Sequence, residues 1–590
     1  MDNHFSDMLS LDPQKSSIPI DLPVTQQQPT AISQIDRSIS RLTSKKDEWA
    51  AKPVQDRLRL LDAVASAFIP LCDSWVQLGL VAKGARQDPY ALGWEWAGGP
   101  MPILRYLRAL KRTLTAIERT GRPPLPSPLR TRPDGQVFAN VYPSNFYERV
   151  STPGTTVDVW MEPGLSEEDV LAEQAREYFL PPKTGKVCAV LAAGNVSGGP
   201  FNDCLGKLFV ENVVVLLKMN PVNDYIGPLL ETALDRLISE GYVQVVYGGA
   251  NEGSYMVNHP SVDSIYMMGS DKTYEAIVFG TGPEAQRRKD AREPLFSKPF
   301  SAELGNIAPA IIVPGPWNDR DLRYQAEQIA SHLCDSGSYS CSRSRVIVQH
   351  SQWSLRHNLL DHLKTVLSGV LPRAPYYPGA TELYERFVSA HPQALRIGAA
   401  MDETLPWAVI PDISPDKQDE ICFTTESFCP VIAETSIDAP NAADFIAKAV
   451  DFANSELWGT LSATIIVHPK SLHEPDVAAS IEQAVEKLRY GVVSINCLPG
   501  LGWGMAVPPW GSYPGNLPWE IQSGLGFIHN AYMYAQPQKT VMRGPFRTWP
   551  TPPWFPSQSH RMAEICKRVV AYEARPSLSR MLSIGIAALR

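Results

Sequence analysis

Four short apolar runs, separated by segments of helix length, constrain most strongly what this chain can fold into. The runs are Val187–Leu191, Val213–Leu217, Val243–Tyr247 and Ile265–Met268. Continuous apolar runs are typical of parallel strands buried on both faces, and their alternation with helices predicts a doubly wound α/β sheet. In such sheets ligands bind beyond the carboxyl ends of the strands. Asn195, Lys218 and the pair Gly269–Ser270 follow three of the runs, so we expect a binding site there.

A second α/β unit is predicted to begin near Phe300. Its parts are a strand at Ala310–Val313, a helix that opens with Asp319 as N-cap and ends near Asp335, and a strand at Val346–Val348. Aspartate is a favoured N-cap, and a glycine such as Gly337 after a helix is a typical stop signal. Cys341 is therefore expected in the turn between helix and strand, where its side chain can face a cleft.

Charge and cysteine usage argue against several classes of protein. The net charge is -8 and no basic run is present, which argues against a nucleic-acid binder. The nine cysteines are odd in number and scattered without a C-x-x-C pair or a Cys/His metal spacing, so neither a disulfide framework nor a metal site is predicted. No apolar stretch approaches the roughly 18 to 20 residues needed to span a bilayer. We therefore expect a reduced, cytoplasmic protein.

Three side chains offer chemistry on a carbonyl group. Cys341 supplies a thiol, the most nucleophilic of the uncharged side chains. Glu303 precedes an apolar strand, and partial desolvation there raises a carboxyl pKa toward the range useful for a general base. Asn195 can donate an N–H to a developing oxyanion, together with a backbone N–H of the nucleophile. Ser340 is the alternative nucleophile, although a hydroxyl needs a strong adjacent base.

The order of these residues resembles that of the aldehyde dehydrogenase superfamily. The matching positions are Asn195, Lys218, Gly269–Ser270, Glu303–Leu304–Gly305, Cys341 and Glu426-x-Phe428. The resemblance covers roughly Ile39 to Tyr534. It implies NAD(P)-dependent oxidation of an aldehyde to a carboxylic acid through a cysteine thiohemiacetal and a thioester. It also implies a homodimer or homotetramer.

The resemblance assigns a role to each matching residue. Cys341 is the implied nucleophile, Asn195 the oxyanion donor, and Glu303 the base that activates water to hydrolyse the thioester. The implied binding residues for NAD or NADP are Lys218, Gly269, Ser270, Glu426 and Phe428.

The resemblance also implies an organisation into domains. We predict a disordered tail over 1–38, whose polar, Gln- and Pro-rich sequence cannot bury enough apolar surface to fold. The other predicted parts are N-terminal helices with the dinucleotide-binding domain (39–299), a catalytic domain (300–498), and a return to the cofactor domain with a bridging strand and a C-terminal extension (499–590). A Pro- and Gly-rich excursion near 121–164 is expected to pair with another lobe or subunit. The apolar end, Leu582–Leu589, is predicted to form a packed terminal helix.

The chain departs from the family pattern at the nucleophile and in the cofactor region. Anchoring on Arg345 places Ser340 at the position of the family cysteine, with Cys341 one residue later. Pro221 stands where NAD-preferring members usually carry an acidic residue, so the choice between NAD and NADP stays open. Tyr274 replaces a glycine of the cofactor-binding helix, where its bulk is expected to alter how closely the cofactor approaches.

These departures leave two alternative functions. One is an acylating, coenzyme A-linked aldehyde dehydrogenase or acyl reductase; the retention of Glu303 argues against it, because acylating members often lack that base. The other is a catalytically inactive binding or scaffold protein on the same fold.

Overall fold

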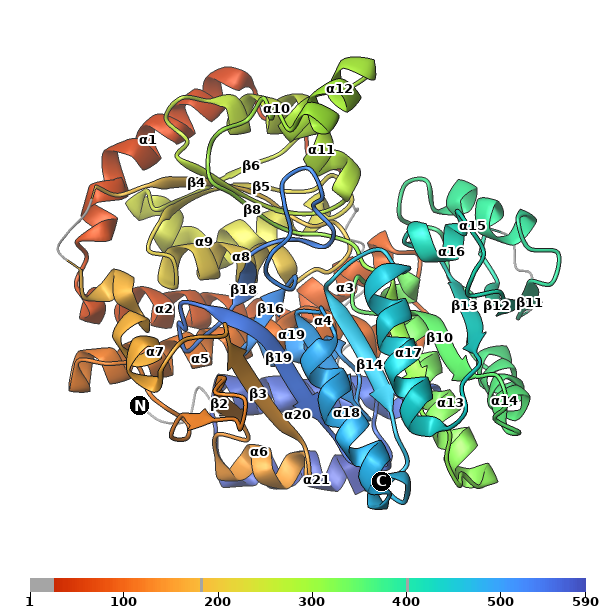
Figure 1. The fold of residues 1–590 in the computed structure, drawn as a ribbon. Coiled ribbons are helices and arrows are strands. Elements are labelled where there is room, and N and C mark those ends of the chain that lie inside the picture. Colours follow the sequence, from red (N-terminus) through yellow and green to blue (C-terminus); the bar gives the residue numbers. More distant parts are fainter. Residues whose placement is uncertain (1–25, 181–183, 399–402, 590) are drawn as a thin grey trace.

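Two large sheets organise the molecule. The computed structural model describes residues 26–180, 184–398 and 403–589 (Figure 1). A six-stranded sheet lies in the upper lobe of Figure 1, and an eleven-stranded sheet runs through the lower and right-hand parts. Helices cover both sheets, so the predicted doubly wound α/β architecture is confirmed.

Five helices precede the first sheet, and the first of them packs against its strands. They are α1 (Ile32–Ala50), α2 (Val54–Phe68), α3 (Cys72–Ala82), α4 (Pro89–Gly98) and α5 (Pro100–Thr120). Helix α1 begins inside the segment predicted to be a disordered tail, so that prediction is wrong for 32–38. Ile35, Ile39 and Leu42 are buried and recur at helical spacing, which gives α1 an apolar face to pack. Residues 1–25 of the predicted tail lie outside the described residues.

One helical stretch, Val54–Ala82, is long and apolar enough to cross a membrane by length and composition alone. The expectation that no segment reaches that length is therefore wrong. In this structure the stretch consists of α2, a 3-10 turn at Ile69–Leu71 and α3, and Leu61 and Trp75 are buried. Because α2 packs against α5, the apolar composition of this stretch is also that of a core helix.

The six-stranded sheet has the order β17–β8–β7–β4–β5–β6. Its strands are β4 (Val187–Leu191), β5 (Val214–Lys218), β6 (Val243–Val246), β7 (Ser264–Met268), β8 (Phe300–Glu303) and β17 (Gly524–Leu525). Its helices are α8 (Gly199–Phe209), α9 (Gly227–Glu240), α10 (Ala250–Asn258), α11 (Asp271–Phe279) and α12 (Pro283–Ala291). Strands β4 to β8 pair in parallel, and β17 joins β8 antiparallel. The four strands expected from the apolar runs are all present.

The eleven-stranded sheet has the order β1–β2–β3–β19–β15–β14–β9–β10–β13–β12–β11. Its strands are β1 (Arg130–Thr131), β2 (Val137–Tyr142), β3 (Thr156–Met161), β9 (Ala308–Ile312), β10 (Ser344–His350), β11 (Leu395–Ile397), β12 (Trp407–Ile413), β13 (Val431–Ile437), β14 (Ser462–Ile466), β15 (Val492–Ile495) and β19 (Pro537–Arg543). The helices around it are α13 (Asp319–Cys334), α14 (Arg356–Ser368), α15 (Ala380–Ser389), α16 (Ile421–Thr424), α17 (Ala442–Ser455) and α18 (Pro475–Lys487).

The boundary between the two units differs from the prediction. Strand β8, which includes Phe300, belongs to the first sheet because it pairs in parallel with β7, with Met268 opposite Glu303. The second unit therefore starts at β9, not near residue 300. The N-cap of α13 is Asn318, whose side chain accepts a hydrogen bond from the N–H of Asp321, and not Asp319 as predicted.

The excursion near 121–164 returns to the same chain. It forms β1, β2 and β3, and β3 pairs antiparallel with β19, which in turn pairs in parallel with β15. The excursion thus extends the sheet of the second unit within one chain. Shorter elements complete this region and the return to the first sheet: α6 (Phe146–Ser151), α7 (Glu167–Glu173), α19 (Gly500–Met505), β16 (Pro509–Gly511) and β18 (Phe527–His529).

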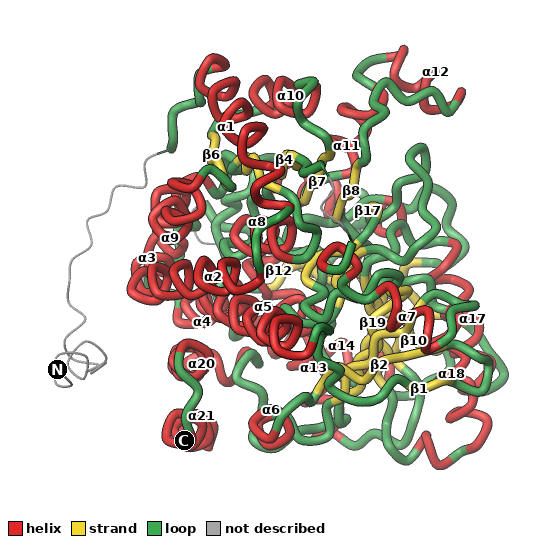
Figure 2. The backbone as a smooth tube through the Cα atoms, turned by 90° about the vertical axis from the view of Figure 1, so that its left-hand side faces the viewer, coloured by secondary structure: helices red, strands yellow, loops and turns green. Residues whose placement is uncertain are grey.

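The C-terminal extension folds into α20 (Ser559–Ala574) and α21 (Leu578–Leu589). Both views place these helices beside α6 (Figures 1 and 2). The predicted terminal helix is present, but it is only partly packed. Ile584 and Ala587 are buried, whereas Leu582 and Ile586 are more than half exposed.

Candidate active site

The loop that carries Cys341 is held in an uncommon backbone conformation. Ser336, Gly337 and Ser338 all adopt positive φ angles of 51°, 66° and 83° between α13 and β10. Positive φ is unfavourable for serine, so packing and hydrogen bonds have to hold it. The buried Ser338 hydroxyl donates to the carbonyl of Leu333 at 2.8 Å. Cys341 lies in the turn that follows, as predicted.

The structure brings Cys341 and Glu303 into direct contact. The thiol donates to Glu303 Oε1 over 3.1 Å, although 38 positions separate the two residues in the sequence. Glu303 lies at the carboxyl end of β8 and is buried. Trp510 in β16 also donates from its indole Nε1 to Glu303 Oε1, at 3.2 Å. No local sequence pattern marks this contact, because 207 positions separate the two residues.

Burial sets the protonation of this pair. It raises the pKa of Glu303 to about 7, while the hydrogen bonds from Cys341 and Trp510 act in the opposite direction. Burial also raises the pKa of Cys341 well above its ordinary value, and the charges of Glu303 and Glu426 add to the rise. The thiol is therefore protonated at neutral pH. A general base is needed to ionise it, and Glu303 is in hydrogen-bond contact.

Ser340 faces away from this pair. Its hydroxyl lies 3.1 Å from that of Ser342, and the side chain is buried, whereas Cys341 is partly exposed. Ser340 also hydrogen bonds to Asp335, a buried carboxyl whose pKa burial raises to about 6. The hydroxyl thus belongs to a buried polar cluster, and no contact of the described residues joins it to Glu303.

Asn195 follows β4 and reaches the same loop. Its Nδ2 donates to the carbonyl oxygen of Tyr339 over 3.0 Å. A side-chain amide carries two N–H donors, so one remains for a ligand. Behind it, Lys83 of the α3 C-terminus forms a buried ion pair with Glu95 at 2.7 Å and lies 3.5 Å from the Asn195 carbonyl. This buried pair was not predicted from the sequence.

Two buried arginines fix the nucleophile loop to the Glu426 segment. Arg343 Nε donates to the carbonyl of Ser340 at 3.0 Å, and Arg345 Nη1 donates to the carbonyl of Ser427 at 2.6 Å. Arg345 also pairs with Glu426 at 3.2 Å. Sequence reasoning used Arg345 only as an anchor for alignment and missed Arg343. A charged residue at the start of an apolar strand gives no sign of being buried.

The absence of a side chain at Gly305 leaves space for the carboxylate of Glu426. A Cβ at Gly305 would lie 2.1 Å from Glu426 Oε2, so a larger residue would displace this carboxylate. Phe428, two residues on, is half-buried and its ring lies 5.7 Å from that of Tyr339. Cys429, which replaces the family glycine, is fully buried.

Residues at the carboxyl ends of β5 and β7 fit a nucleotide. Lys218 ends β5, is buried, and has one long hydrogen bond, to the carbonyl of Met219 at 3.4 Å. Burial lowers its pKa, while Glu252 and Asp224 partly restore it. A buried ammonium with a single weak acceptor suits a hydroxyl or phosphate ligand. Pro221, at the position where many family members carry an acidic residue, is exposed.

The turn after β7 leaves space for a ligand at the start of α11. A Cβ at Gly269 would meet only atoms of Met267, at 3.8 Å or more, so the turn is not crowded. Ser270 is the N-cap of α11 and accepts from the N–H of Thr273. Tyr274 is buried, and its ring lies 4.9 Å from that of Phe300. The side chain of Tyr274 thus fills the core, and its expected effect on how closely the cofactor approaches the helix stays a prediction.

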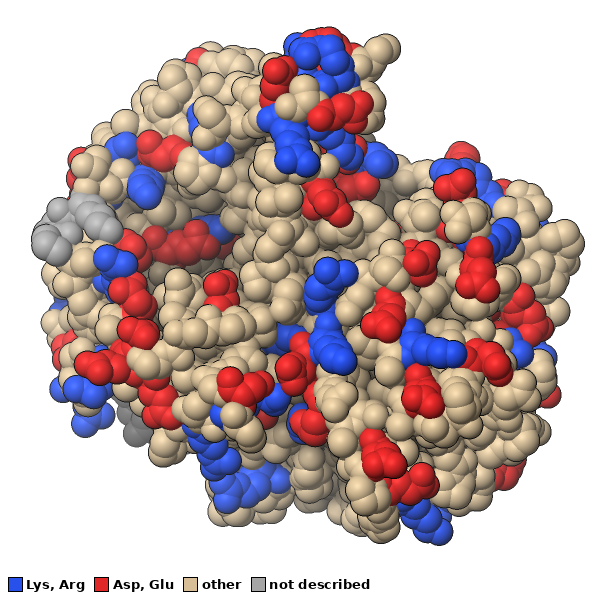
Figure 3. All heavy atoms as spheres, viewed as in Figure 1, with Lys and Arg blue, Asp and Glu red and all other residues tan. Residues whose placement is uncertain are grey.

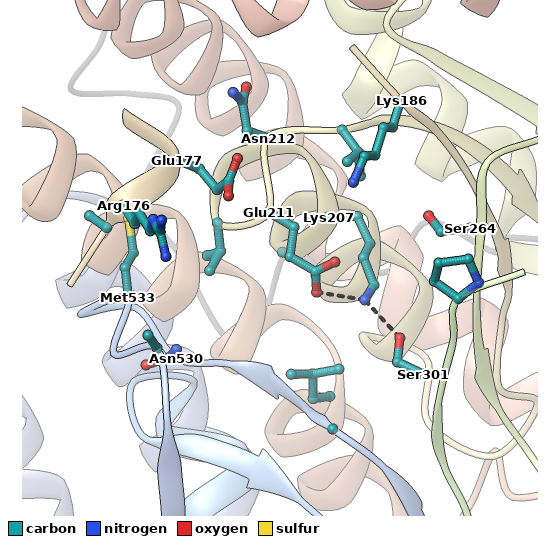
Figure 4. Close-up of a pocket in the computed structure, with 18 of the residues that line it drawn as sticks. Arg176, Glu177, Lys186, Lys207, Glu211, Asn212, Ser264, Ser301, Asn530 and Met533 are labelled. Atoms are coloured by element: carbon teal, nitrogen blue, oxygen red, sulfur yellow. Dashed lines mark hydrogen bonds and ion pairs between the residues drawn. The ribbon is translucent and has the colours of Figure 1, made fainter. Parts of the chain in front are cut away.

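A cavity of about 750 Å³ lies at the opposite edge of the first sheet. Its lining includes Lys186, Ser264 and Pro299, which stand at the amino ends of β4, β7 and β8. Figure 4 shows Lys207 reaching between Glu211 and Ser301 in this cavity, at 2.6 and 3.2 Å. Figure 3 shows acidic side chains in a hollow on the left of the molecule. None of the predicted site residues lines the cavity.

Comparisons with known proteins converge on one family. A model of the aldehyde dehydrogenase family matches residues 205–372. The 2-aminomuconic semialdehyde dehydrogenase of Mus musculus is 25% identical over 335 residues, which cover 53% of this chain and 59% of that protein. N-succinylglutamate 5-semialdehyde dehydrogenase of Novosphingobium aromaticivorans is 24% identical over 191 residues, covering 32% of this chain and 37% of that one. The matched region thus spans less than two thirds of these relatives.

Solved structures share the fold over most of the chain. An aldehyde dehydrogenase from Pseudomonas syringae, complexed with NAD+ and octanal, has a TM-score of 0.58 at 13% identity and covers 88% of this chain and 91% of its own. A glyceraldehyde-3-phosphate dehydrogenase from Methanocaldococcus jannaschii, complexed with NADP, has a TM-score of 0.57 at 16% identity, with coverage of 88% and 95%. The predicted fold class is thereby confirmed.

Proposed function

Because this chain belongs to the aldehyde dehydrogenase superfamily, we propose that it oxidises an aldehyde to a carboxylic acid with NAD or NADP as the oxidant. The observation that carries the proposal is the 3.1 Å contact between Cys341 Sγ and Glu303 Oε1. This contact pairs a nucleophile with a general base. The candidate cofactor-binding residues Lys218 and Gly269 lie at the carboxyl ends of β5 and β7.

The first step is attack by sulfur. Glu303 accepts the thiol proton of Cys341, and the thiolate adds to the carbonyl carbon of the aldehyde to give a thiohemiacetal. The amide of Asn195 has a second N–H to donate to the oxygen that becomes negative in this step. Arg343 keeps the loop in place through the Ser340 carbonyl.

The residues described above fit a nicotinamide dinucleotide. Lys218 is suited to a ribose hydroxyl or a phosphate, the start of α11 at Gly269–Ser270 to a pyrophosphate, and Glu426 with Phe428 to the nicotinamide ribose and ring. A nicotinamide dinucleotide held by these residues would supply the acceptor for the hydride that the thiohemiacetal carbon loses on oxidation to a thioester.

Hydrolysis of the thioester completes the reaction. Once Glu303 has released the thiol proton to solvent, its carboxylate takes a proton from water, and the hydroxide adds to the thioester carbon. The carbon–sulfur bond breaks, the carboxylic acid leaves and the Cys341 thiol re-forms. The balance is one aldehyde, one oxidised dinucleotide and one water to one acid, one reduced dinucleotide and one proton.

Steady-state assays test this proposal. A panel of aliphatic, aromatic and carboxylate-bearing aldehydes is incubated with NAD or NADP, and formation of the reduced dinucleotide is followed with and without coenzyme A. We expect acid production without coenzyme A, its loss in Cys341→Ala, and its retention in Ser340→Ala. Strict dependence on coenzyme A would contradict the hydrolytic step. Inactivity of the wild type on every aldehyde, together with no binding of either dinucleotide, would contradict the function as a whole.

A further inference from the structure

Three potential metal ligands meet in the second unit, and none of them belongs to the candidate active site. They are His391, just after α15, and Glu420 and Cys422, at the start of α16. One donor atom from each lies within 4.8 Å of the other two, and all three residues are buried. Both α15 and α16 lie at the right of the molecule in Figure 1. Because 28 residues lie between His391 and Glu420, the next ligand along the chain, no short sequence motif marks this cluster.

The hydrogen bond on one side of the His391 ring fixes the role of the other side. Nδ1 lies 2.7 Å from the carbonyl oxygen of Phe387, and a carbonyl can only accept, so Nδ1 carries the hydrogen. In the neutral ring Nε2 then carries no hydrogen and has a free lone pair. Metal-binding histidines are oriented in this way, with the second ring nitrogen donating to a carbonyl or carboxylate.

That lone pair faces a carboxylate. His391 Nε2 and Glu420 Oε1 lie 2.9 Å apart in a buried environment. A proton on Nε2 makes this contact an ion pair, and a metal ion bound by both atoms would replace that proton.

We propose that His391, Glu420 and Cys422 bind a zinc ion that joins α15 to α16. Imidazole nitrogen, thiolate sulfur and carboxylate oxygen form a donor set that Zn²⁺ accepts, whereas Mg²⁺ and Ca²⁺ prefer oxygen alone. Three protein ligands leave one tetrahedral position for a water molecule.

The charges at this site balance with a divalent cation. A thiolate and a carboxylate neutralise Zn²⁺, and Lys417, which is half-exposed, lies 2.5 Å from the outer oxygen Oε2 of Glu420. Glu420 Oε1, the oxygen nearer to His391, is left for the metal and the N–H of Cys422. Without metal, burial raises the pKa of the Cys422 thiol. Binding of zinc therefore releases the thiol proton to solvent, one per ion.

Such a site braces the segment that contacts the nucleophile loop. Helix α16 leads directly into Glu426 and Ser427, which bind Arg345 through a carboxylate and a backbone carbonyl. A metal at the start of α16 restrains this segment from its N-terminal side. The role is structural and does not depend on which reaction the protein catalyses.

Metal analysis of the intact protein tests the proposal. The purified chain is dialysed against a chelator, loaded with Zn²⁺ alone, passed through a desalting column and analysed by elemental mass spectrometry. We expect about one zinc per chain in the wild type and in the matched control Cys566→Ser, whose cysteine is also buried but lies in α20. We expect a value near zero in Cys422→Ser and His391→Gln.

A second measurement covers variants that fail to fold. Loading the wild type with Co²⁺ instead should give a thiolate-to-cobalt charge-transfer band, which reports sulfur ligation directly. Loss of that band in His391→Gln, with unchanged circular dichroism, supports a shared site. Sub-stoichiometric zinc in the wild type, or equal zinc in the wild type and Cys422→Ser, would overturn the proposal. These outcomes are independent of any dehydrogenase activity.

Discussion

Replacing Trp510 by phenylalanine should move the pH dependence of thioester hydrolysis. The substitution removes the indole N–H that lies 3.2 Å from Glu303 Oε1. A hydrogen bond to a charged group contributes about 1.5 to 3 kcal/mol, and this one is at the long end of the distance range, so we take the lower value. One pKa unit corresponds to about 1.4 kcal/mol. Loss of the hydrogen bond from Trp510 is therefore expected to raise the pKa of Glu303 from about 7 to about 8.

The direction follows from the form of Glu303 that acts. Hydrolysis needs the carboxylate, so the rate rises with pH through the pKa of Glu303. At pH 7 the ionised fraction falls from about one half to about one tenth, a roughly fivefold slower hydrolysis that disappears above about pH 9. A loss of packing alone would instead lower the rate equally at every pH.

Hydrolysis of p-nitrophenyl acetate measures this step without a cofactor. The ester acylates Cys341, and turnover after the initial burst reports hydrolysis of the thioester. Product release is followed at the isosbestic wavelength of nitrophenol so that pH does not change the signal. The control is Trp503→Phe in α19, because that indole makes no hydrogen bond to Glu303 within the described residues. An unshifted ascending limb in Trp510→Phe, or an equal shift in the control, would refute the reasoning.

Three further predictions concern the cofactor, the Glu426 pocket and stability. Lys218→Ala should weaken NAD and NADP binding by about tenfold or more in calorimetry while leaving ester hydrolysis unchanged, since one buried charge-assisted contact is lost; equal affinity would contradict the assignment. Gly305→Ala should lower the melting temperature and cofactor affinity, because its Cβ meets Glu426 Oε2 at 2.1 Å, whereas Gly504→Ala, with open space around it, should do neither. Because burial raises the pKa of Glu303 from 4.5 to about 7, its contribution to stability is present below pH 4.5 and is lost as pH rises to about 7. The Glu303→Gln variant lacks this titration, so its melting temperature should change less with pH over that range than that of the wild type. The difference corresponds to up to about 3 kcal/mol of unfolding free energy. Parallel plots of melting temperature against pH for the two proteins would contradict this prediction.

The sequence was a good guide where local pattern decides structure. The run Val187–Leu191 became β4 with the same bounds, because a succession of apolar residues, four of the five buried, suits a central parallel strand. Gly241 ends α9 with a φ of 88°, the left-handed cap that glycine favours. The turn position of Cys341 followed from the same signals.

Pairing between strands that are distant in the sequence could not be predicted from local sequence pattern. The residues of strand β8 do not indicate which of the two sheets it joins. Only its pairing with β7 assigns it to the first sheet. Helical structure was predicted from residue 39, but the first turns of α1 (32–38) were assigned to the tail, because polar residues outnumber the buried Ile35 there. The contact of Trp510 with Glu303, and the buried arginines around Ser340, depend on the assembled fold. The candidate site residues were proposed from their order in the sequence, while their contacts with one another required the structure.

The most direct test of the central claim, that Cys341 is the nucleophile, is to locate the acyl group on the protein. The wild type is mixed with p-nitrophenyl acetate, quenched in acid during the initial burst, digested and analysed by peptide mass spectrometry. Because hydrolysis of the thioester limits turnover after the burst, the thioester is present at that time, and we predict a single acetyl group on the sulfur of Cys341. An acetyl group on Ser340, or on no residue of this loop, would contradict the account.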